Sequence, residues 1–101
     1  MGEKDINQTI TRMLYMIIEK FHPGKAKKLY QRFEEKGRML PEGVIYINSW
    51  IDEQVATCYL VMESDTKEKI DEWIKCWSDL ADFEVIPVIT SAQAKEKIFA
   101  G

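Results

Sequence analysis

The residues of this sequence with the greatest capacity for chemistry are aromatic and polar side chains that recur along three strand patterns. They are Tyr15, Glu19, Tyr46, Asn48, Trp50, Tyr59 and Glu63. Aromatic walls around a few polar groups are typical of pockets that hold small molecules. Aromatic residues are also enriched at protein interfaces. The set therefore predicts either a ligand-binding pocket or a dimer core whose carboxylates lie in water at the strand ends.

Glu19 and Glu63 are the two carboxylates of this set. They end strands that we expect to pair antiparallel, which would place them at opposite ends of a sheet, so a paired-carboxylate mechanism is not expected. Either one could act alone as a general base if it were buried. Arg38 follows the first helix pattern, and it could clamp an anionic ligand or lie in solvent beside the helix end.

Other reactive residue types form no motif. His22 is the only histidine and precedes Pro-Gly in a turn, so we expect it to lie in solvent and to form no histidine-rich metal site. Cys58 and Cys76 fall in separate elements and are expected to be buried, reduced thiols. The chain has neither a glycine-rich phosphate loop nor a Ser-His-Asp motif. The sequence therefore predicts no metal and no cofactor.

Hydrophobic periodicity divides the chain into short strands and helices. The predicted strands cover residues 13–21, 44–51, 55–63 and 83–89. The predicted helices cover residues 25–36 and 66–80, and a short final helix starts at Thr90 and ends near Phe99. Residues 1–12 show little periodicity, so we expect a flexible N-terminal tail before a single domain at 13–101.

Several residues mark where the predicted helices begin and end. Gly37 is placed to cap the first helix in a left-handed conformation. Pairs at Asp65 with Glu68, and at Thr90 with Gln93, are predicted to cap the starts of the later helices. Trp73 and Trp77 recur at helical spacing, which predicts core packing rather than ligand stacking.

The order of these elements favours one fold class. Two strand–helix–strand units joined by a hairpin give an α+β, ferredoxin-like βαββαβ arrangement with a four-stranded antiparallel sheet and a short C-terminal helix. The first and third strands are then central. Pro87 falls in the fourth strand, which agrees with an edge position because proline cannot donate to a ladder.

Alternate strand positions are apolar on both sides, although two helices can cover only one face of the sheet. One alternating set includes Leu14, Met16, Ile18, Ile45, Ile47, Ile51, Leu60 and Met62, and the other includes Tyr15, Ile17, Tyr46, Trp50, Tyr59 and Val61. A large apolar patch rarely stays exposed, and the simplest cover is a second copy of the chain. The sequence therefore predicts a homodimer.

Composition excludes some partners. Lys and Arg number 14 against 17 Asp and Glu, so the net charge is −3. A nucleic-acid binder or a protein that docks on anionic membranes usually presents a basic face, so neither partner is expected. No apolar run is long enough for a transmembrane helix, and we expect a cytoplasmic protein.

A set of short motifs resembles a known family. They are F-H-P-G at 21–24, Y-Q-R-F-E-E-K-G-R-M-L-P-E-G at 30–43, S-W-I-D-E at 49–53, C-Y-L-V-M-E-S-D at 58–65, D-E-W-I-K-C-W at 71–77 and F-E-V-I-P-V-I-T-S-A at 83–92. Together these motifs resemble a family of small prokaryotic domains of unknown function within the ferredoxin-like dimeric α/β barrels, over about residues 13–98. The resemblance implies the fold and the dimer, and it implies no activity.

Two functions follow as hypotheses. The first is a homodimeric module that binds or senses a small apolar or aromatic molecule. The second is a cofactor-independent oxygenase or isomerase that acts on a small aromatic or lactone substrate, which rests on fold analogy. A carboxylate with a strongly raised pKa inside a pocket would favour the enzyme.

Overall fold

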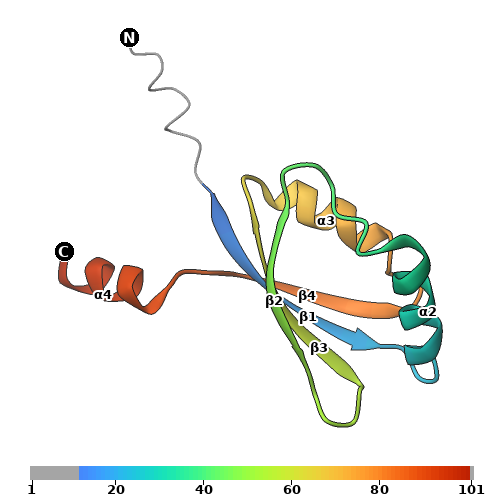
Figure 1. Ribbon diagram of the computed structural model, residues 1–101. Helices are drawn as coiled ribbons and strands as arrows, with labels where there is room; N and C mark the ends of the chain where they lie inside the picture. The colour runs from blue at the N-terminus through green and yellow to red at the C-terminus, as the bar shows by residue number, and fades with distance from the viewer. Residues whose placement is uncertain (1–11, 101) are drawn as a thin grey trace.

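The computed structural model describes residues 12–100, so most of the predicted N-terminal tail, residues 1–11, lies outside the described residues. The elements follow the predicted order (Figure 1): β1 (Met13–Phe21), α2 (Ala26–Lys36), β2 (Ile45–Ile51), β3 (Thr57–Ser64), α3 (Lys67–Lys75), β4 (Ala81–Val88) and α4 (Ser91–Ala100). The predicted α+β, ferredoxin-like arrangement with a short C-terminal helix is confirmed.

The four strands form one antiparallel sheet in the order β2-β3-β1-β4. β1 and β3 are central, and Pro87 lies in the edge strand β4, both as predicted. Tyr15 pairs with Met62, Ile17 with Leu60 and Glu19 with Cys58. An irregularity in the pairing of β2 with β3 falls between Tyr46 and Asn48, and it changes which residues of β2 share a face.

This register corrects the predicted grouping of apolar strand residues. Leu60 and Met62 share a face with Tyr15 and Ile17, not with Leu14 and its alternate neighbours, because the β1–β3 pairing places them directly opposite. The face that carries Ile17 is buried beneath the helices. We call the other the open face; its apolar members include Ile45, Trp50, Tyr59 and Ile86, all of which are exposed.

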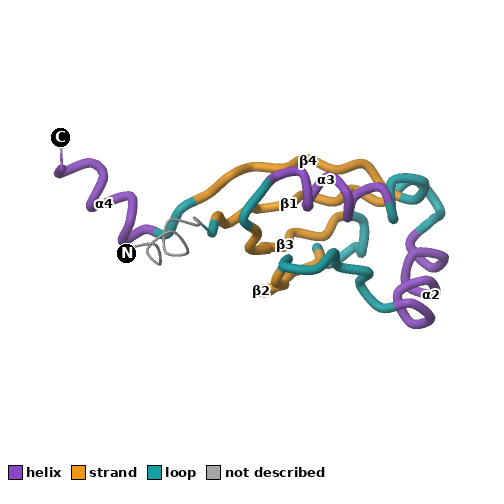
Figure 2. Tube along the Cα trace, turned by 90° about the horizontal axis from the view of Figure 1, so that it is seen from above, coloured by secondary structure: helices purple, strands orange, loops and turns teal. Residues whose placement is uncertain are grey.

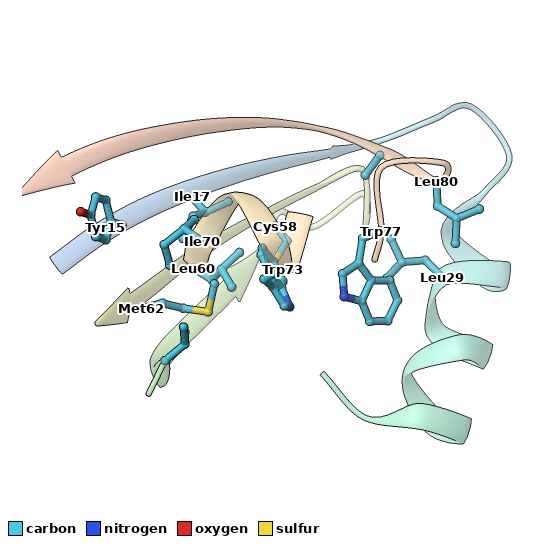
Figure 3. Close-up of a cluster of buried hydrophobic side chains, with 12 residues drawn as sticks. Tyr15, Ile17, Leu29, Cys58, Leu60, Met62, Ile70, Trp73, Trp77 and Leu80 are labelled. Carbon is cyan, nitrogen blue, oxygen red and sulfur yellow. The ribbon is translucent and has the colours of Figure 1, made fainter. Parts of the chain in front are cut away.

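The core lies between the buried face of the sheet and α3 (Figure 3). Ile17, Leu60 and Met62 from the sheet meet Ile70 and Trp73 from α3, and all five are almost completely buried. Trp77 and Leu80 extend the same cluster toward Leu29 of α2. The predicted core role of both tryptophans is confirmed.

The end of α3 and its cap differ from the prediction. The helix ends at Lys75 rather than at residue 80, because residues 76–80 continue as tight turns with Trp77 N donating to Ile74 O and Leu80 N to Trp77 O. Its N-cap is Thr66, whose hydroxyl accepts a bond from Lys69 N at 3.4 Å, so the predicted cap at Asp65 is one residue early.

The other predicted caps agree with the structure. Gln93 N donates to Thr90 Oγ1 at 3.1 Å, and Thr90 N donates to the side chain of Gln93 at 2.9 Å, which is the reciprocal capping pair that the sequence predicts. Gly37 caps α2 at the predicted position, with its N–H donating to Phe33 O, but its φ of 69° and ψ of −160° form a conformation essentially restricted to glycine rather than the predicted left-handed one.

The helices α2 and α3 relate differently to the sheet. α3 lies against the buried face, whereas α2 stands at the end of the sheet where β1 ends and β4 begins (Figures 1 and 2). α4 projects away from the sheet at the opposite end, and it has no buried residue.

Truncation of Ile70 tests the packing of α3 on the sheet. The side chain is fully buried, so Ile70→Ala should lower the free energy of unfolding by about 3 kcal/mol because it removes apolar contacts and leaves a cavity. Glu72→Ala, which changes an exposed position of the same helix, should stay within about 0.5 kcal/mol of the unchanged protein. Urea unfolding measures both values, and equal small effects would contradict the packing described here.

Candidate functional site

A cleft lies between α2 and the end of the sheet. Its cavity measures about 140 Å³, and Glu19 and Cys58 form its floor. Leu29, Tyr30 and Phe33 of α2 form one wall. The remaining lining residues are Phe21, Arg38, Ser49 and Ile51. A smaller lobe of about 40 Å³ continues toward Trp73 and Trp77 and shares Glu19 and Arg38 with the main cavity. The cleft thus combines an aromatic and aliphatic wall with a few polar groups.

The cleft exists because α2 does not bury its whole apolar stripe. Leu29 is the only fully buried residue of this helix, while Tyr30 and Phe33 of the same stripe remain more than one-third exposed. Amphipathic helices normally bury such a stripe against a core. Here the exposed aromatic rings face a cavity, which leaves an apolar surface available to a ligand.

Glu19 is the unusual residue of the site. It is 6% exposed and pairs across the sheet with Cys58. Burial raises the pKa of Glu19 from 4.5 to about 7, while the charge of Arg38 and a hydrogen bond with the Cys58 thiol oppose the rise. The carboxyl group can therefore both hold and release a proton near neutral pH.

Cys58 is a buried, free thiol on the floor of the cleft. Burial, together with the neighbouring Glu19 charge, raises the pKa of Cys58 to about 12. A thiol with such a pKa is almost entirely protonated at neutral pH, so it is a poor nucleophile. Its role in the cleft is that of a hydrogen-bond partner to Glu19.

Arg38 is fixed at both its backbone and its side chain. The indole N–H groups of Trp73 and Trp77 both donate to the Arg38 carbonyl, at 2.8 and 3.2 Å. The guanidinium carbon lies 3.8 Å from the centre of the Tyr46 ring and 5.1 Å from that of Phe33. Cation–π contacts with these two rings hold the guanidinium in place. Its position beside the cleft is therefore set by two separate groups of contacts.

The structure brings three of the predicted site residues together. Glu19 and Arg38 line the cleft, and Tyr46 contacts Arg38 and hydrogen-bonds the lining residue Ser49 through its hydroxyl, at 2.6 Å from Ser49 Oγ. Tyr15 lies on the same face of the sheet as Glu19 but near the start of β1, where it is buried in the row of Met62 and Tyr46, with its hydroxyl directed to Met13 Sδ at 3.6 Å. Tyr15 therefore belongs to the core rather than to the cleft.

The other predicted site residues lie elsewhere. Asn48, Trp50 and Tyr59 are exposed on the strands, and Trp50 pairs with Tyr59 on the open face. Glu63 pairs with Leu14 at the far end of β1 from Glu19 and approaches Arg12 at 3.8 Å. The two carboxylates therefore do not face each other, and the predicted residue set does not form one site.

His22 departs from its expected position in solvent. Its Nε2 contacts Asp82 Oδ1 at 2.9 Å, and its side chain is about one-third exposed. The hydrogen bond with Asp82 raises the pKa of His22. The contact ties the turn after β1 to the start of β4, so it is a structural link rather than part of the cleft.

The sequence pattern does not identify several of the residues that line the cleft. Tyr30 and Phe33 fall within the helix predicted at 25–36 without further distinction, and Cys58 is predicted only as a buried, reduced thiol. Only the register of β1 against β3 reveals that Cys58 faces Glu19. The available sequence signal was the glutamate itself, which interrupts the apolar run of the first strand.

These features define a small α+β domain with ferredoxin-like topology and a cleft that joins a buried carboxyl group to a guanidinium. Residues 13–101 match the family described as "Domain of unknown function (DUF3303)", and the chain belongs to this family. This membership agrees with the resemblance seen in the sequence to a family without known activity. No curated protein and no solved structure gives a significant match.

Two further observations concern the described part of the chain. Among residues 12–100, no three His, Cys, Asp or Glu side chains are placed to hold a metal ion. In the same part of the chain, no helix is long and apolar enough to cross a membrane.

The raised pKa of Glu19 makes stability depend on pH. The folded protein holds this proton more tightly than the unfolded chain, so stability falls as pH rises from about 4.5 through 7 and then levels off. From pH 5 to pH 8 the loss from Glu19 should amount to about 2.5 kcal/mol. Glu19→Gln should remove this part and leave only the contribution of His22, whose pKa is also raised in the folded protein. Urea unfolding at both values, at one protein concentration, measures the difference. Glu72→Gln, at an exposed position, should keep the loss, and a pH-independent wild-type value would refute the assignment.

Proposed function

We propose that this protein is a homodimer that binds a small, largely apolar molecule in the cleft beneath α2. The observation that carries this proposal is the placement of Glu19, a buried carboxyl group at the floor of a cavity lined by aromatic side chains. Burying an ionisable group costs stability unless it is compensated. A ligand that contacts Glu19 explains why the fold retains it.

The open face supports the dimer part of the proposal. Its exposed residues include Ile45, Trp50, Tyr59 and Ile86, with Trp50 retaining 55% of its surface. Ile98 and Phe99 of α4 are also exposed, on a helix that projects beyond its own domain (Figure 1). A second copy would cover these apolar surfaces without any other partner. This arrangement corresponds to the dimeric α/β barrels that the sequence resembles.

Other predicted properties belong to the same proposal. The net charge of −3 gives no support to a nucleic-acid or membrane partner. A cytoplasmic location stays a prediction. Binding needs no metal or cofactor, since the cleft offers its own charged and apolar groups.

Native mass spectrometry of gently purified protein tests both parts of the proposal. We expect a dimer of the 11.8-kDa chain that carries the extra mass of a small molecule. Trp50→Lys should give a monomer because it places a charge on the open face, and Ser49→Phe should keep the dimer but lose the extra mass because it fills the cleft. Lys28→Gln, at an exposed position of α2, serves as a control that should change neither. A monomeric wild-type protein would refute the dimer.

A second candidate function is an enzyme that moves a proton. A pKa of about 7 suits Glu19 to take a proton from a carbon next to a double bond and return it to the far carbon of that double bond, which shifts the double bond and isomerises the substrate without any oxidant or reductant. Arg38 beside the cleft would stabilise the negative charge that forms on the substrate. The raised pKa of Glu19 specifically favours this candidate over simple binding.

Deuterium exchange separates the enzyme from the binder. Once a ligand is identified, incubation in D₂O should introduce deuterium into its acidic C–H position if Glu19 transfers protons. The rate should fall by at least about 100-fold in Glu19→Gln because general acid–base catalysis contributes on the order of 10² or more. NMR of the ligand measures the exchange. Exchange that persists in Glu19→Gln would exclude Glu19 as the base, and no exchange in the wild type would favour a binding protein.

A further inference from the structure

We infer that the ligand of the cleft is a small organic anion, with its negative group on Arg38 and an apolar body of about one ring against α2. This inference rests on the proposed binding function and specifies the chemical class that the cleft accepts. Its basis is the geometry of Arg38, Glu19 and the aromatic wall rather than any single feature.

The side-chain N–H groups of Arg38 are available to bind an anion. The guanidinium carbon lies over the Tyr46 ring at 3.8 Å from its centre and over the Phe33 ring at 5.1 Å. Cation–π contact with a ring does not use the N–H groups of a guanidinium as hydrogen-bond donors. Within residues 12–100, no carboxylate forms an ion pair with Arg38, and no oxygen accepts a hydrogen bond from its side chain. A carboxylate can take two such N–H groups at once.

The charged side chains that line the cleft also favour an anion. Arg38 supplies a guanidinium cation to the lining. Among residues 12–100, Glu19 is the only acidic side chain that lines either lobe of the cleft. When Glu19 is protonated, the cleft has one uncompensated positive charge and a carboxylic acid that can donate a hydrogen bond. Both features complement an anion, whereas a cationic ligand would meet the charge of Arg38.

The size and the apolar wall of the cleft determine how large the rest of the ligand can be. A cavity of roughly 150 Å³ is sufficient for benzene in a protein interior, and this cleft measures about 140 Å³. Tyr30, Phe33 and Leu29 provide the apolar wall, with the two aromatic rings partly exposed before any ligand binds. One aromatic ring or a short branched chain therefore fits beside the anionic group.

Binding of the anion is coupled to protonation of Glu19. The anion needs Glu19 in its neutral form, because two negative charges in one buried cleft repel each other. Binding should therefore take up a proton at pH values above 7. Affinity should be nearly constant below that value and should fall about tenfold per pH unit above it.

Phenylacetate and phenylacetamide form a matched pair of probes, because they share a ring and differ in charge. We would titrate each into the full-length protein at pH 6 and pH 8 and follow the three tryptophan indole N–H signals by NMR. Trp73 and Trp77, which donate to the Arg38 carbonyl, should shift, while Trp50 on the open face should not. Phenylacetate should bind at least about tenfold more tightly than the amide at pH 6, and about tenfold more weakly at pH 8 than at pH 6.

Two variants test whether Arg38 causes the preference for the anion and whether Glu19 causes the pH dependence. Arg38→Gln should abolish the preference for phenylacetate and leave the amide within about twofold, because it removes the charge but keeps a polar side chain. Glu19→Gln should retain binding of phenylacetate and remove its pH dependence. Lys28→Gln, which removes a charge from an exposed position of α2, should match the wild type. The indole signals also show whether each variant is folded.

The outcomes separate this inference from the proposed function. Equal binding of phenylacetate and phenylacetamide to the wild-type protein would overturn the anionic ligand and leave binding in the cleft intact. That comparison uses no variant, so it stands even if Arg38→Gln does not fold. If neither probe shifts Trp73 or Trp77, both the anionic ligand and this cleft as a site for a single ring are overturned.

Discussion

The carbonyl group of Arg38 is the point on which the site depends. Trp73 of α3 and Trp77 of the turns that follow this helix both donate to it. Buried indole N–H groups need an acceptor, so the core can close only when the chain between α2 and β2 delivers this carbonyl. Gly37, with a backbone conformation essentially restricted to glycine, makes that turn possible. The packing of α3 thus determines where α2 ends and where the guanidinium lies.

Glu19 shows a conflict between folding and function. Its position on a central strand would suit an apolar residue, because its neighbours Ile17 and Leu60 are completely buried. Desolvation of the carboxylate raises its pKa and lowers stability above neutral pH. Folds tend to depart from local consistency at functional sites. The cost of Glu19, its contact with a cavity and its proximity to a fixed arginine point to the same place in the structure.

The topology could be predicted because each helix and strand has its own hydrophobic periodicity and because most helix caps are recognisable in the sequence. β1 has the bounds predicted from its apolar run, and Pro87 falls on an edge strand. The cleft could not be predicted in the same way, since it depends on register. Glu19 and Cys58 face each other only because of the way β1 pairs with β3. The irregularity after Tyr46 places Tyr46 on the opposite face of the sheet from Asn48 and Trp50. The half-buried stripe of α2 has the same sequence pattern as a fully buried one.

The edge strand β2 connects the two proposed surfaces. One of its faces carries Ser49 and Ile51 to the cleft, and the other carries Ile45 and Trp50 to the open face. β2 pairs only with β3, so its outer edge has no neighbouring strand within the described chain. A second copy on the open face would restrict this strand and thereby stabilise one wall of the cleft. Because linkage is reciprocal, a ligand that orders the same wall would also strengthen the dimer.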